Sequence, residues 1–172
     1  MADALTLSLL AVLTFSVFSW TLACFFKDAS IADLFWPLYH ALAAATYLYL
    51  ALATEISTLA VVFSLLICLW ASRLFLHLFF RKLGQEEDHR YAAIRERNRE
   101  HFWWQSFFTI FLMQSCLAWL ICAPFSHVIL SDQSFSALHG LGLFIMVCGL
   151  IYEWVADEQL KNYLGRASED DG

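Results

Sequence analysis

Three basic side chains stand four residues apart near the end of an apolar stretch of the sequence: Arg73, His77 and Arg81. On an α-helix this spacing puts all three on one face. Ionisable groups inside a membrane-spanning helix are costly and usually line a cavity or a pathway. We therefore predict that Arg73 and His77 bind a polar or anionic part of a substrate, whereas Arg81 reaches the membrane surface. The alternative is that Arg73 and His77 only pair with neighbouring helices.

A second polar group follows at once in residues 84–91, GQEEDHRY. Its carboxylates and its tyrosine are suited to acid–base chemistry or to positioning a ligand, and Glu87 and Tyr91 are the candidate substrate-binding residues. The alternative is a solvated helix on the membrane surface over Glu86–Glu100, with Tyr91 and Ile94 facing lipid headgroups. Composition alone leaves both interpretations open. Further arginines in this connection most simply mark its side of the membrane: Arg95, Arg97 and Arg99.

Two carboxylates, Glu153 and Asp157, lie one helical turn apart near the end of the last apolar stretch. An ordinary i, i+4 pair with Lys161 accounts for Asp157 but leaves Glu153 unexplained. Asp33 stands near the start of the second apolar stretch. All these groups are expected at the same face of the membrane, as a single cytoplasm-facing site would require.

The residue pattern argues against several chemistries. The six histidines are too widely spaced for a membrane di-iron centre, and no cysteine–histidine cluster predicts a zinc site, so we assign no metal. The five cysteines lie singly in apolar stretches, which predicts buried thiols rather than disulfides. The sequence contains no P-loop, no GxSxG and no dinucleotide fingerprint. No catalytic residue is therefore assigned from motifs.

Composition shows what must hold these groups in place. Of the 172 residues, 60% are apolar or aromatic and 15% are charged, against about 45–50% and about 25% in soluble domains. The sequence therefore predicts an all-α integral membrane bundle lying in a lipid bilayer. Five stretches approach the roughly 20 residues that cross a bilayer; they are residues 4–26, 34–53, 58–80, 102–123 and 135–155. Residues 1–160 would form this transmembrane domain, and residues 161–172 a cytoplasmic acidic tail.

The distribution of positive charge predicts the orientation of these five spans. Nine of the ten Lys and Arg residues fall in the first connection, in the third connection (residues 81–101) or in the tail. Cytoplasmic loops carry the excess of Lys and Arg, so the N-terminus is expected outside and the C-terminus inside. The net charge of −6 argues against nucleic acid as a partner.

The central motif resembles the signature of a bacterial membrane family related to steroid 5-alpha-reductases. Residues 70–95 follow its pattern of RL-x-x-HL-x-x-R-x-x-G-x-x-ED-x-RY-x-x-x-R. Flanking pieces agree, namely residues 30–36 (SIADLFW), the region of Phe111 and Gln114, and residues 153–160 (EWVADEQL). The resemblance is colinear over residues 30–160.

The resemblance implies a polytopic helical reductase that takes hydride from NADPH and acts on a lipid-like substrate. It implies that Arg73 and His77 lie on the helix lining the substrate pocket, and that Glu153 and Asp157 match positions that help hold the dinucleotide. It also implies a bacterial inner membrane as the location, with the endoplasmic reticulum membrane as second choice.

The departures from the family pattern matter for function. Leu164 stands where a cationic residue is expected, and no RYSRHPNYFGE-like segment follows. Trp70 replaces a tyrosine of the steroid enzymes' pocket, which argues against a steroid substrate. We expect a chain that resembles the N-terminal part of a reductase and does not bind NADPH alone. A separate C-terminal polypeptide would complete the enzyme in trans, or the chain is a truncated product. Two alternatives stay open: a non-catalytic membrane protein with a lipid-like ligand pocket, and a small transporter-like bundle.

Overall fold

The structure is a computed structural model that describes residues 1–53, 56–131 and 135–170, with side chains as far as Tyr163. Every regular element in this part of the chain is a helix, which confirms the predicted all-α class. The chain divides into two compact units, Met1–Gln133 and Ser134–Gly172. Each unit is described here by itself.

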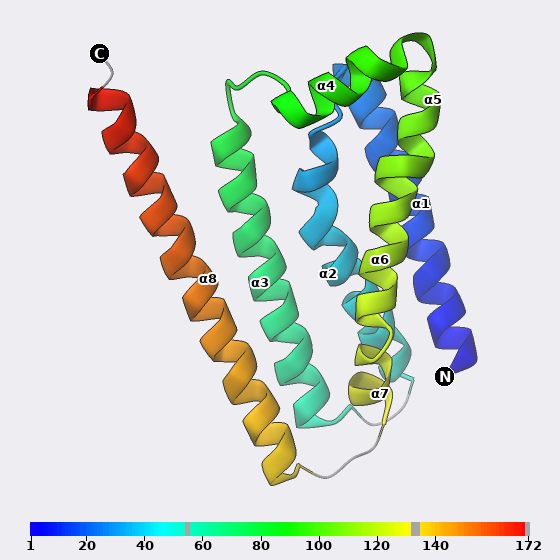
Figure 1. The fold of residues 1–172 in the computed structure, drawn as a ribbon. Coiled ribbons are helices and arrows are strands. Elements are labelled where there is room, and N and C mark those ends of the chain that lie inside the picture. Colours follow the sequence, from blue (N-terminus) through cyan, green and yellow to red (C-terminus); the bar gives the residue numbers. More distant parts are fainter. Residues whose placement is uncertain (54–55, 132–134, 171–172) are drawn as a thin grey trace. The chain divides into compact units, whose positions relative to one another are not determined.

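The first unit is a helical bundle with one helix across its end (Figure 1). Its long helices are α1 (Ala2–Phe26), α2 (Ile31–Ala51) and α3 (Thr58–Lys82). The short helix α4 (His89–Asn98) crosses the end of the bundle. The chain then returns alongside α1 and α2 through consecutive helical segments: η1 (Arg99–His101), α5 (Phe102–Ser106), η2 (Phe107–Leu112), α6 (Met113–Cys122) and α7 (Phe125–Leu130).

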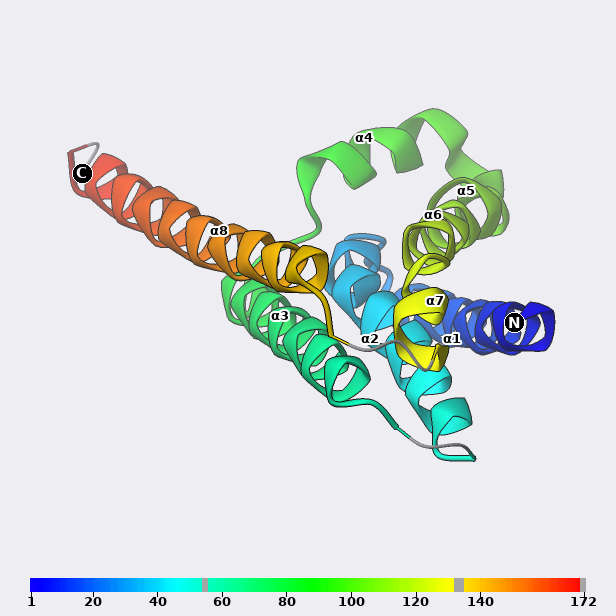
Figure 2. The ribbon, with the colours of Figure 1, turned by 90° about the horizontal axis from the view of Figure 1, so that it is seen from below.

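Helix α2 is the central element of this unit and contacts α1, α3, α6 and α7. Figure 2 shows it between α1 and α3. Its buried residues include the large aromatic side chains Tyr39 and Tyr47 together with the small Ala43 and Ala44. Small residues let neighbouring helices approach closely, and the tyrosines fill the remaining space. Because protein surrounds α2 on several sides, it does not need a fully apolar surface.

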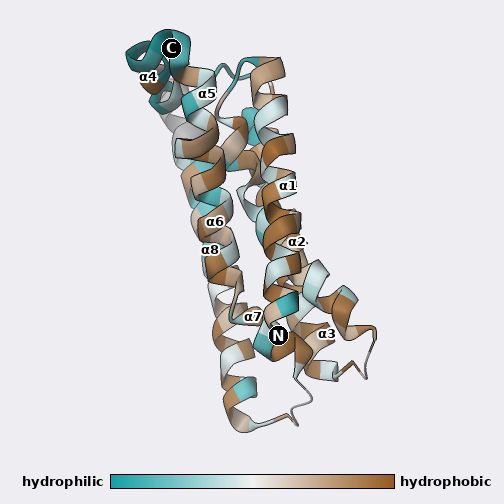
Figure 3. Cartoon of the chain, turned by 90° about the vertical axis from the view of Figure 1, so that its right-hand side faces the viewer, coloured by the Kyte–Doolittle hydropathy of each residue, from teal (hydrophilic) through white to brown (hydrophobic). Residues whose placement is uncertain are grey.

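Among the residues that the structure describes, four helices are long and apolar enough to cross a membrane: Ala2–Phe26, Thr58–Lys82, His89–Cys122 and Ala137–Tyr163. They correspond to four of the five predicted spans. The remaining span, residues 34–53, lies mostly in the helix α2 as expected but is not among these four, since His40 and several tyrosines lower its hydropathy. Figure 3 shows apolar residues along the long helices and hydrophilic residues gathered on α4. The count of five and the orientation remain predictions.

Neutral hydrogen bonds join α1, α2 and α6 inside the bundle. The Ser8 hydroxyl donates to the Tyr47 hydroxyl at 2.9 Å, and Trp119 Nε1 donates to Ser8 Oγ at 3.1 Å. Ser19 and Tyr39 share a further hydrogen bond of 2.7 Å between their hydroxyls. Such contacts between helices typically contribute about 0.6–2 kcal/mol each in a membrane.

A π-helical segment, η2, interrupts the helix between α5 and α6. A π-helix inserts extra backbone into an α-helix and shifts the face of the residues that follow it, often at functional sites. Here η2 contacts α1, and Gln114 is the second residue after it, in the first turn of α6. The predicted span 102–123 is therefore helical throughout but is not a regular α-helix.

The second unit consists of the single helix α8 (Ala137–Asp170). The predicted tail, residues 161–172, continues this helix as far as Asp170, and residues 171–172 lie outside the described residues. Glu153 and Asp157 are one turn apart on α8, so they lie on one face of it.

Candidate functional site

The turn between α1 and α2 begins the candidate site. Lys27 follows α1 in the left-handed conformation (φ 56°), and the Asp28 backbone N–H then donates to the Ala23 carbonyl oxygen at 3.0 Å. The Asp28 carboxylate accepts hydrogen bonds from the Ser30 backbone N–H at 2.9 Å and from the Ser30 hydroxyl, and it lies 2.8 Å from Lys82 Nζ. Partial burial raises the pKa of Asp28, but the hydrogen bonds from Lys82 and Ser30 outweigh burial and lower it. Asp28 therefore ties the end of α3 to this turn.

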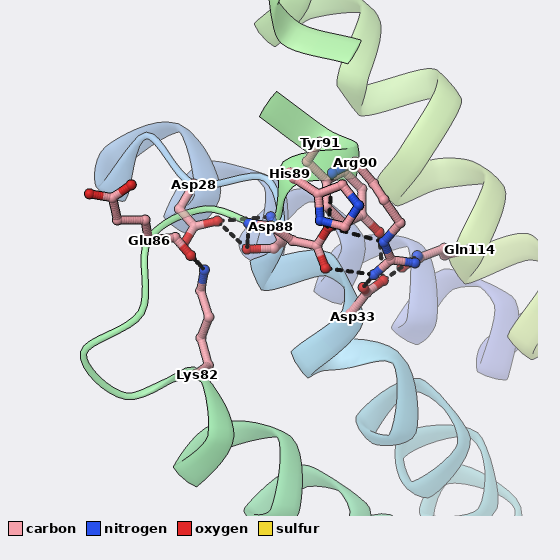
Figure 4. A network of polar contacts seen from close by, with 10 residues as sticks. Asp28, Asp33, Lys82, Glu86, Asp88, His89, Arg90, Tyr91 and Gln114 are labelled. Carbon is pink, nitrogen blue, oxygen red and sulfur yellow. Dashed lines mark hydrogen bonds and ion pairs between the residues drawn. The ribbon is translucent and has the colours of Figure 1, made fainter. Parts of the chain in front are cut away.

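Asp33 is the meeting point of α2, α4 and α6 (Figure 4). Its carboxylate accepts a hydrogen bond of 2.5 Å from the Tyr91 hydroxyl and one of 3.0 Å from Arg90 Nη2. Gln114 Nε2 lies 3.4 Å from the same carboxylate oxygen as Tyr91. Tyr91 is buried, with 8% of its surface exposed. The carboxylate of Asp33 is thus held by donors from two other elements.

Asp88 caps the N-terminus of α4 and contributes to the same network. It accepts from the Arg90 backbone N–H at 2.9 Å, and Arg90 Nε and Nη2 lie 3.0 Å and 2.9 Å from its two oxygens. The side-chain hydrogen bond from Arg90 is the main reason that the pKa of Asp88 falls to about 2. The Arg90 guanidinium therefore bridges Asp88 and Asp33.

Glu87 fixes the connection between α3 and α4 onto the α1–α2 turn. Its carboxylate accepts a hydrogen bond of 2.8 Å from the Ala29 backbone N–H and lies 2.8 Å from Arg95 Nη2. Arg95 Nη1 also donates to the Lys27 carbonyl oxygen at 3.0 Å. The Glu87 side chain is only 8% exposed. A carboxylate so enclosed needs these partners, because an unpaired buried charge is strongly unfavourable.

A pocket of about 460 Å³ opens beside this network, within the usual size range of ligand sites. Polar and apolar residues from α2, α3 and the connection line it: Ser30, Asp33, Leu34, Leu78, Arg81, Lys82, Gln85, Glu86, Glu87, Asp88 and His89. Leu34 lies on α2 and Leu78 on the membrane-type helix α3, and the charged residues lie near the ends of these helices or in the connection between α3 and α4. The lining of the pocket is thus mostly polar, with two leucines among its eleven residues.

Two of the predicted site residues, Glu87 and Tyr91, contribute to this pocket. Glu87 lines the pocket, and Tyr91 supports it through Asp33. Arg73 and His77 lie on the same helix as Arg81, two turns and one turn before it, and are not among the residues that line this pocket. Glu153 and Asp157 belong to α8 in the second unit.

The surface-helix interpretation of residues 86–100 is partly correct. A short helix exists, but it begins at His89, and Glu86–Asp88 lead into it. Tyr91 and Ile94 do not face lipid headgroups, since they pack with the buried residues Ala23 and Ala29 of the bundle. The helix is amphipathic, and its apolar face contacts protein.

Sequence reasoning overlooked how Arg90, Arg95 and Gln114 are used. The position of Arg95 in the connection predicts that it marks the membrane side, and the structure shows that it also pairs with Glu87. Gln114 lies in a segment that resembles the family. Its hydrogen bond to Asp33 depends on the helix face on which it lies, and the preceding π-helix shifts that face without a signal in the sequence. No local spacing could have linked Glu87 to Ala29, which lies in a different connection of the chain.

The fold and the site together define a helical membrane-type protein with a polar pocket at one end of its bundle. The chain belongs to the family described as "Protein of unknown function (DUF1295)", whose model matches residues 19–171. This match spans every residue of the network around Asp33 and of the pocket. No curated protein and no solved structure matches the chain.

Proposed function

We propose that this chain is a steroid 5-alpha-reductase-like membrane protein that binds a lipid-like substrate in the pocket at the ends of α2 and α3. The observation that carries the proposal is the pocket itself, with Leu34 and Leu78 on its apolar side and Asp33, Arg81 and Glu87 on its polar side. An amphipathic molecule has this same division between an apolar body and a polar head. Such a molecule reaches the pocket from the bilayer without crossing water.

Residues of the chain have distinct roles in this proposal. Asp33 and Glu87 hold the polar wall in place through Tyr91, Arg90 and Arg95, so most of their contribution is to positioning. Arg73 and His77 continue the face of α3 from Arg81 into the membrane, and we propose that they bind a polar group deeper in the substrate. The proposal therefore gives Glu87 and Tyr91 a supporting role in substrate binding, and Arg73 and His77 a direct one.

The residues that the structure describes do not fit NADPH. A dinucleotide with several phosphates needs a set of cations or free backbone donors. Glu153 and Asp157 are anionic, and Lys161 is the sole lysine or arginine among the described side chains of α8. In the first unit, Lys82 and Arg95 already pair with carboxylates, namely Asp28 and Glu87. Among the described residues, this leaves Arg81 as the one lysine or arginine that lines the pocket without such a pair. We therefore derive no reductive step from this chain.

This misfit favours two versions of the proposed function. In the first, a separate polypeptide of the same family supplies the cations that hold NADPH, and this chain supplies the substrate pocket. In the second, the chain is a non-catalytic membrane protein that binds a lipid-like ligand. Saturation binding of NADPH to the purified full chain in detergent separates both versions from a self-sufficient reductase. We expect no saturable binding up to millimolar cofactor, whereas saturation at micromolar NADPH would overturn the proposal.

The lipid-binding part has its own test. The purified chain is titrated with dioleoylglycerol in a mild maltoside detergent, and retained lipid is counted by native mass spectrometry. Arg73→Ala and His77→Ala are expected to weaken retention several-fold. Arg97→Ala is the matched control, because Arg97 is an exposed arginine of α4 and does not belong to the α3 face that carries Arg73, His77 and Arg81. Equal losses from all three variants would contradict the proposed pocket.

A further inference from the structure

Most charges around the pocket are already matched by a partner. Asp33 and Asp88 share the guanidinium of Arg90, whose Nη2 lies 3.0 Å and 2.9 Å from them. Glu87 pairs with Arg95, and Asp28 pairs with Lys82, each at 2.8 Å. These ion pairs join helices and connections of the first unit, so their charges are already neutralised before a ligand binds.

Two charged side chains that line the pocket are exceptions. Across the described ranges of the chain, the guanidinium of Arg81 and the carboxylate of Glu86 have no hydrogen bond and no ion pair. Lys82 approaches Glu86, but its Nζ donates to the main-chain carbonyl oxygen at 2.6 Å. Figure 4 shows the Glu86 carboxylate without a contact to the other residues drawn. The rim therefore presents one unmatched cation and one unmatched anion.

This pair of opposite charges selects among possible ligand heads. A phosphate or carboxylate group alone would satisfy Arg81 but would lie close to Glu86 and to the carboxylates of the polar wall. An uncharged head would leave both side chains with water only. A head that carries a phosphate and an ammonium group can pair with both, through charge-assisted hydrogen bonds. Charge complementarity of this kind determines specificity more than affinity.

The apolar side of the pocket indicates where such a head comes from. Leu34 follows Asp33 by one residue on α2, and Leu78 precedes Arg81 by one turn on α3. A head bound at the rim would therefore leave its attached chains beside Leu34 and Leu78, and Leu78 lies on a helix that is long and apolar enough to cross a membrane. A water-soluble zwitterion would gain nothing from the leucines.

We propose that the pocket binds the head of a zwitterionic glycerophospholipid of the ethanolamine type, with its phosphate at Arg81, its ammonium at Glu86 and its acyl chains along Leu34 and Leu78. This inference rests on the proposed function, because it names the class of lipid-like ligand that the same pocket takes. It goes beyond that function by assigning the selectivity to Arg81 and Glu86.

The test compares four probes on the purified full chain by native mass spectrometry in a maltoside detergent. The probes are dioleoyl phosphatidylethanolamine, the anionic dioleoyl phosphatidylglycerol, the uncharged dioleoylglycerol, and glycerophosphoethanolamine, which has the same head without chains. We expect the ethanolamine lipid to be retained roughly five- to tenfold more tightly than the other two lipids. Glycerophosphoethanolamine at millimolar concentration should not displace it, and displacement would overturn the assignment to a lipid.

Charge-neutral variants identify the residues responsible. Arg81→Gln and Glu86→Gln should each reduce the preference for the ethanolamine lipid, and Glu86→Gln should improve retention of phosphatidylglycerol. Arg97→Gln and Glu96→Gln, exposed neighbours on α4, should leave the preference unchanged. A preference for phosphatidylglycerol, or equal changes in the pocket variants and the controls, would overturn the inference.

The outcomes also separate this inference from the function on which it rests. If all three lipids are retained equally and Arg73→Ala weakens all of them, the lipid pocket stands and the inferred head selectivity is wrong. If no lipid is retained beyond the level of the Arg73→Ala variant, the proposed function itself is contradicted.

Discussion

The two ends of the first unit are held together by different kinds of polar contact. At the α4 end, ion pairs and charged hydrogen bonds converge on Asp33, Asp88 and Glu87. At the opposite end, the contacts are neutral hydrogen bonds between Ser8, Tyr47 and Trp119. Both networks join helices that are distant in sequence, yet only the first is charged.

The difference follows from the surroundings of each network. Arg90 and Asp33 keep 60% and 35% of their side-chain surface exposed, so water and headgroups can solvate them. Ser8 and Tyr47 have no exposed surface. Burying a charge costs far more than burying a hydroxyl, and the cost is greatest within hydrocarbon. The charged end is therefore the part of the molecule where a polar ligand can be bound.

Asp33→Ala breaks the charged end and should have the largest effect. It removes the acceptor for the buried Tyr91 hydroxyl and one of the two partners of Arg90, which should cost about 2–3 kcal/mol. We expect the melting temperature in detergent to fall by roughly 5–10 °C. Asp3→Ala, a change to an exposed carboxylate of α1, is the control and should change it little. An equal shift in both variants would show that Asp33 does not organise this end.

Tyr47→Phe tests the neutral end, where the expected effect is smaller. The substitution removes the hydroxyl that accepts from Ser8 but keeps the buried ring, so a loss of about 1 kcal/mol is expected. Thermal unfolding in the same detergent measures it against Tyr49→Phe, whose side chain is exposed. A loss as large as that of Asp33→Ala would contradict the proposed difference between the two ends.

Gly84→Ala tests the backbone on which the charged end depends. Gly84 has a φ of +76°, and no atom lies within 4 Å of where a Cβ would stand, so the cost is conformational strain alone. We expect a loss of about 1 kcal/mol. Gly84→Asn should recover part of it, because asparagine tolerates this conformation better. Melting temperatures that rank alanine above asparagine would contradict this account.

Acid should loosen the charged end alone, as the smallest of these effects. The pKa of Asp88 is lowered to about 2, so its contribution is fully present above the usual aspartate pKa of about 4 and is lost as the pH falls towards 2. Hydrogen exchange of α4 amides, corrected for intrinsic rates, should therefore rise between pH 4 and pH 2. Amides of α1 near Ser8 should not change in this window. The Asp88→Asn variant should show a weaker pH dependence of α4 than the unaltered chain, and an unchanged dependence would assign the effect to another group.

The helices were largely predictable from the sequence because long apolar stretches end at charged residues. The expected spans 4–26 and 58–80 correspond to α1 (Ala2–Phe26) and α3 (Thr58–Lys82). The π-helical segment within the fourth span was not predictable, because a π-helix has no hydropathy signature. The lower apolarity of α2 also has a tertiary cause, since four other helices surround it.

The candidate site was predictable in its composition and not in its pairings. Sequence reasoning expected Asp33, Glu87 and Tyr91 at one end of the molecule. The hydrogen bond between Tyr91 and Asp33 joins residues of two different helices, α4 and α2, and no local pattern encodes such a contact. The amphipathic pattern of α4 indicated that Tyr91 is buried, but periodicity alone does not distinguish burial against protein from burial in lipid.

Photo-cross-linking tests the central claim most directly. A dioleoylglycerol with a diazirine in one acyl chain is incorporated into proteoliposomes with the full chain, irradiated, and mapped by peptide mass spectrometry. We expect preferential labelling near Leu34 and Leu78, and loss of that preference when Leu78→Trp fills the pocket. Leu65 and Leu69, exposed on the same helix α3, report ordinary contact with bulk lipid and should label equally in both proteins. Labelling of Leu34 and Leu78 at the same level as Leu65 and Leu69, unchanged in Leu78→Trp, would contradict a lipid-binding pocket at this end of the bundle.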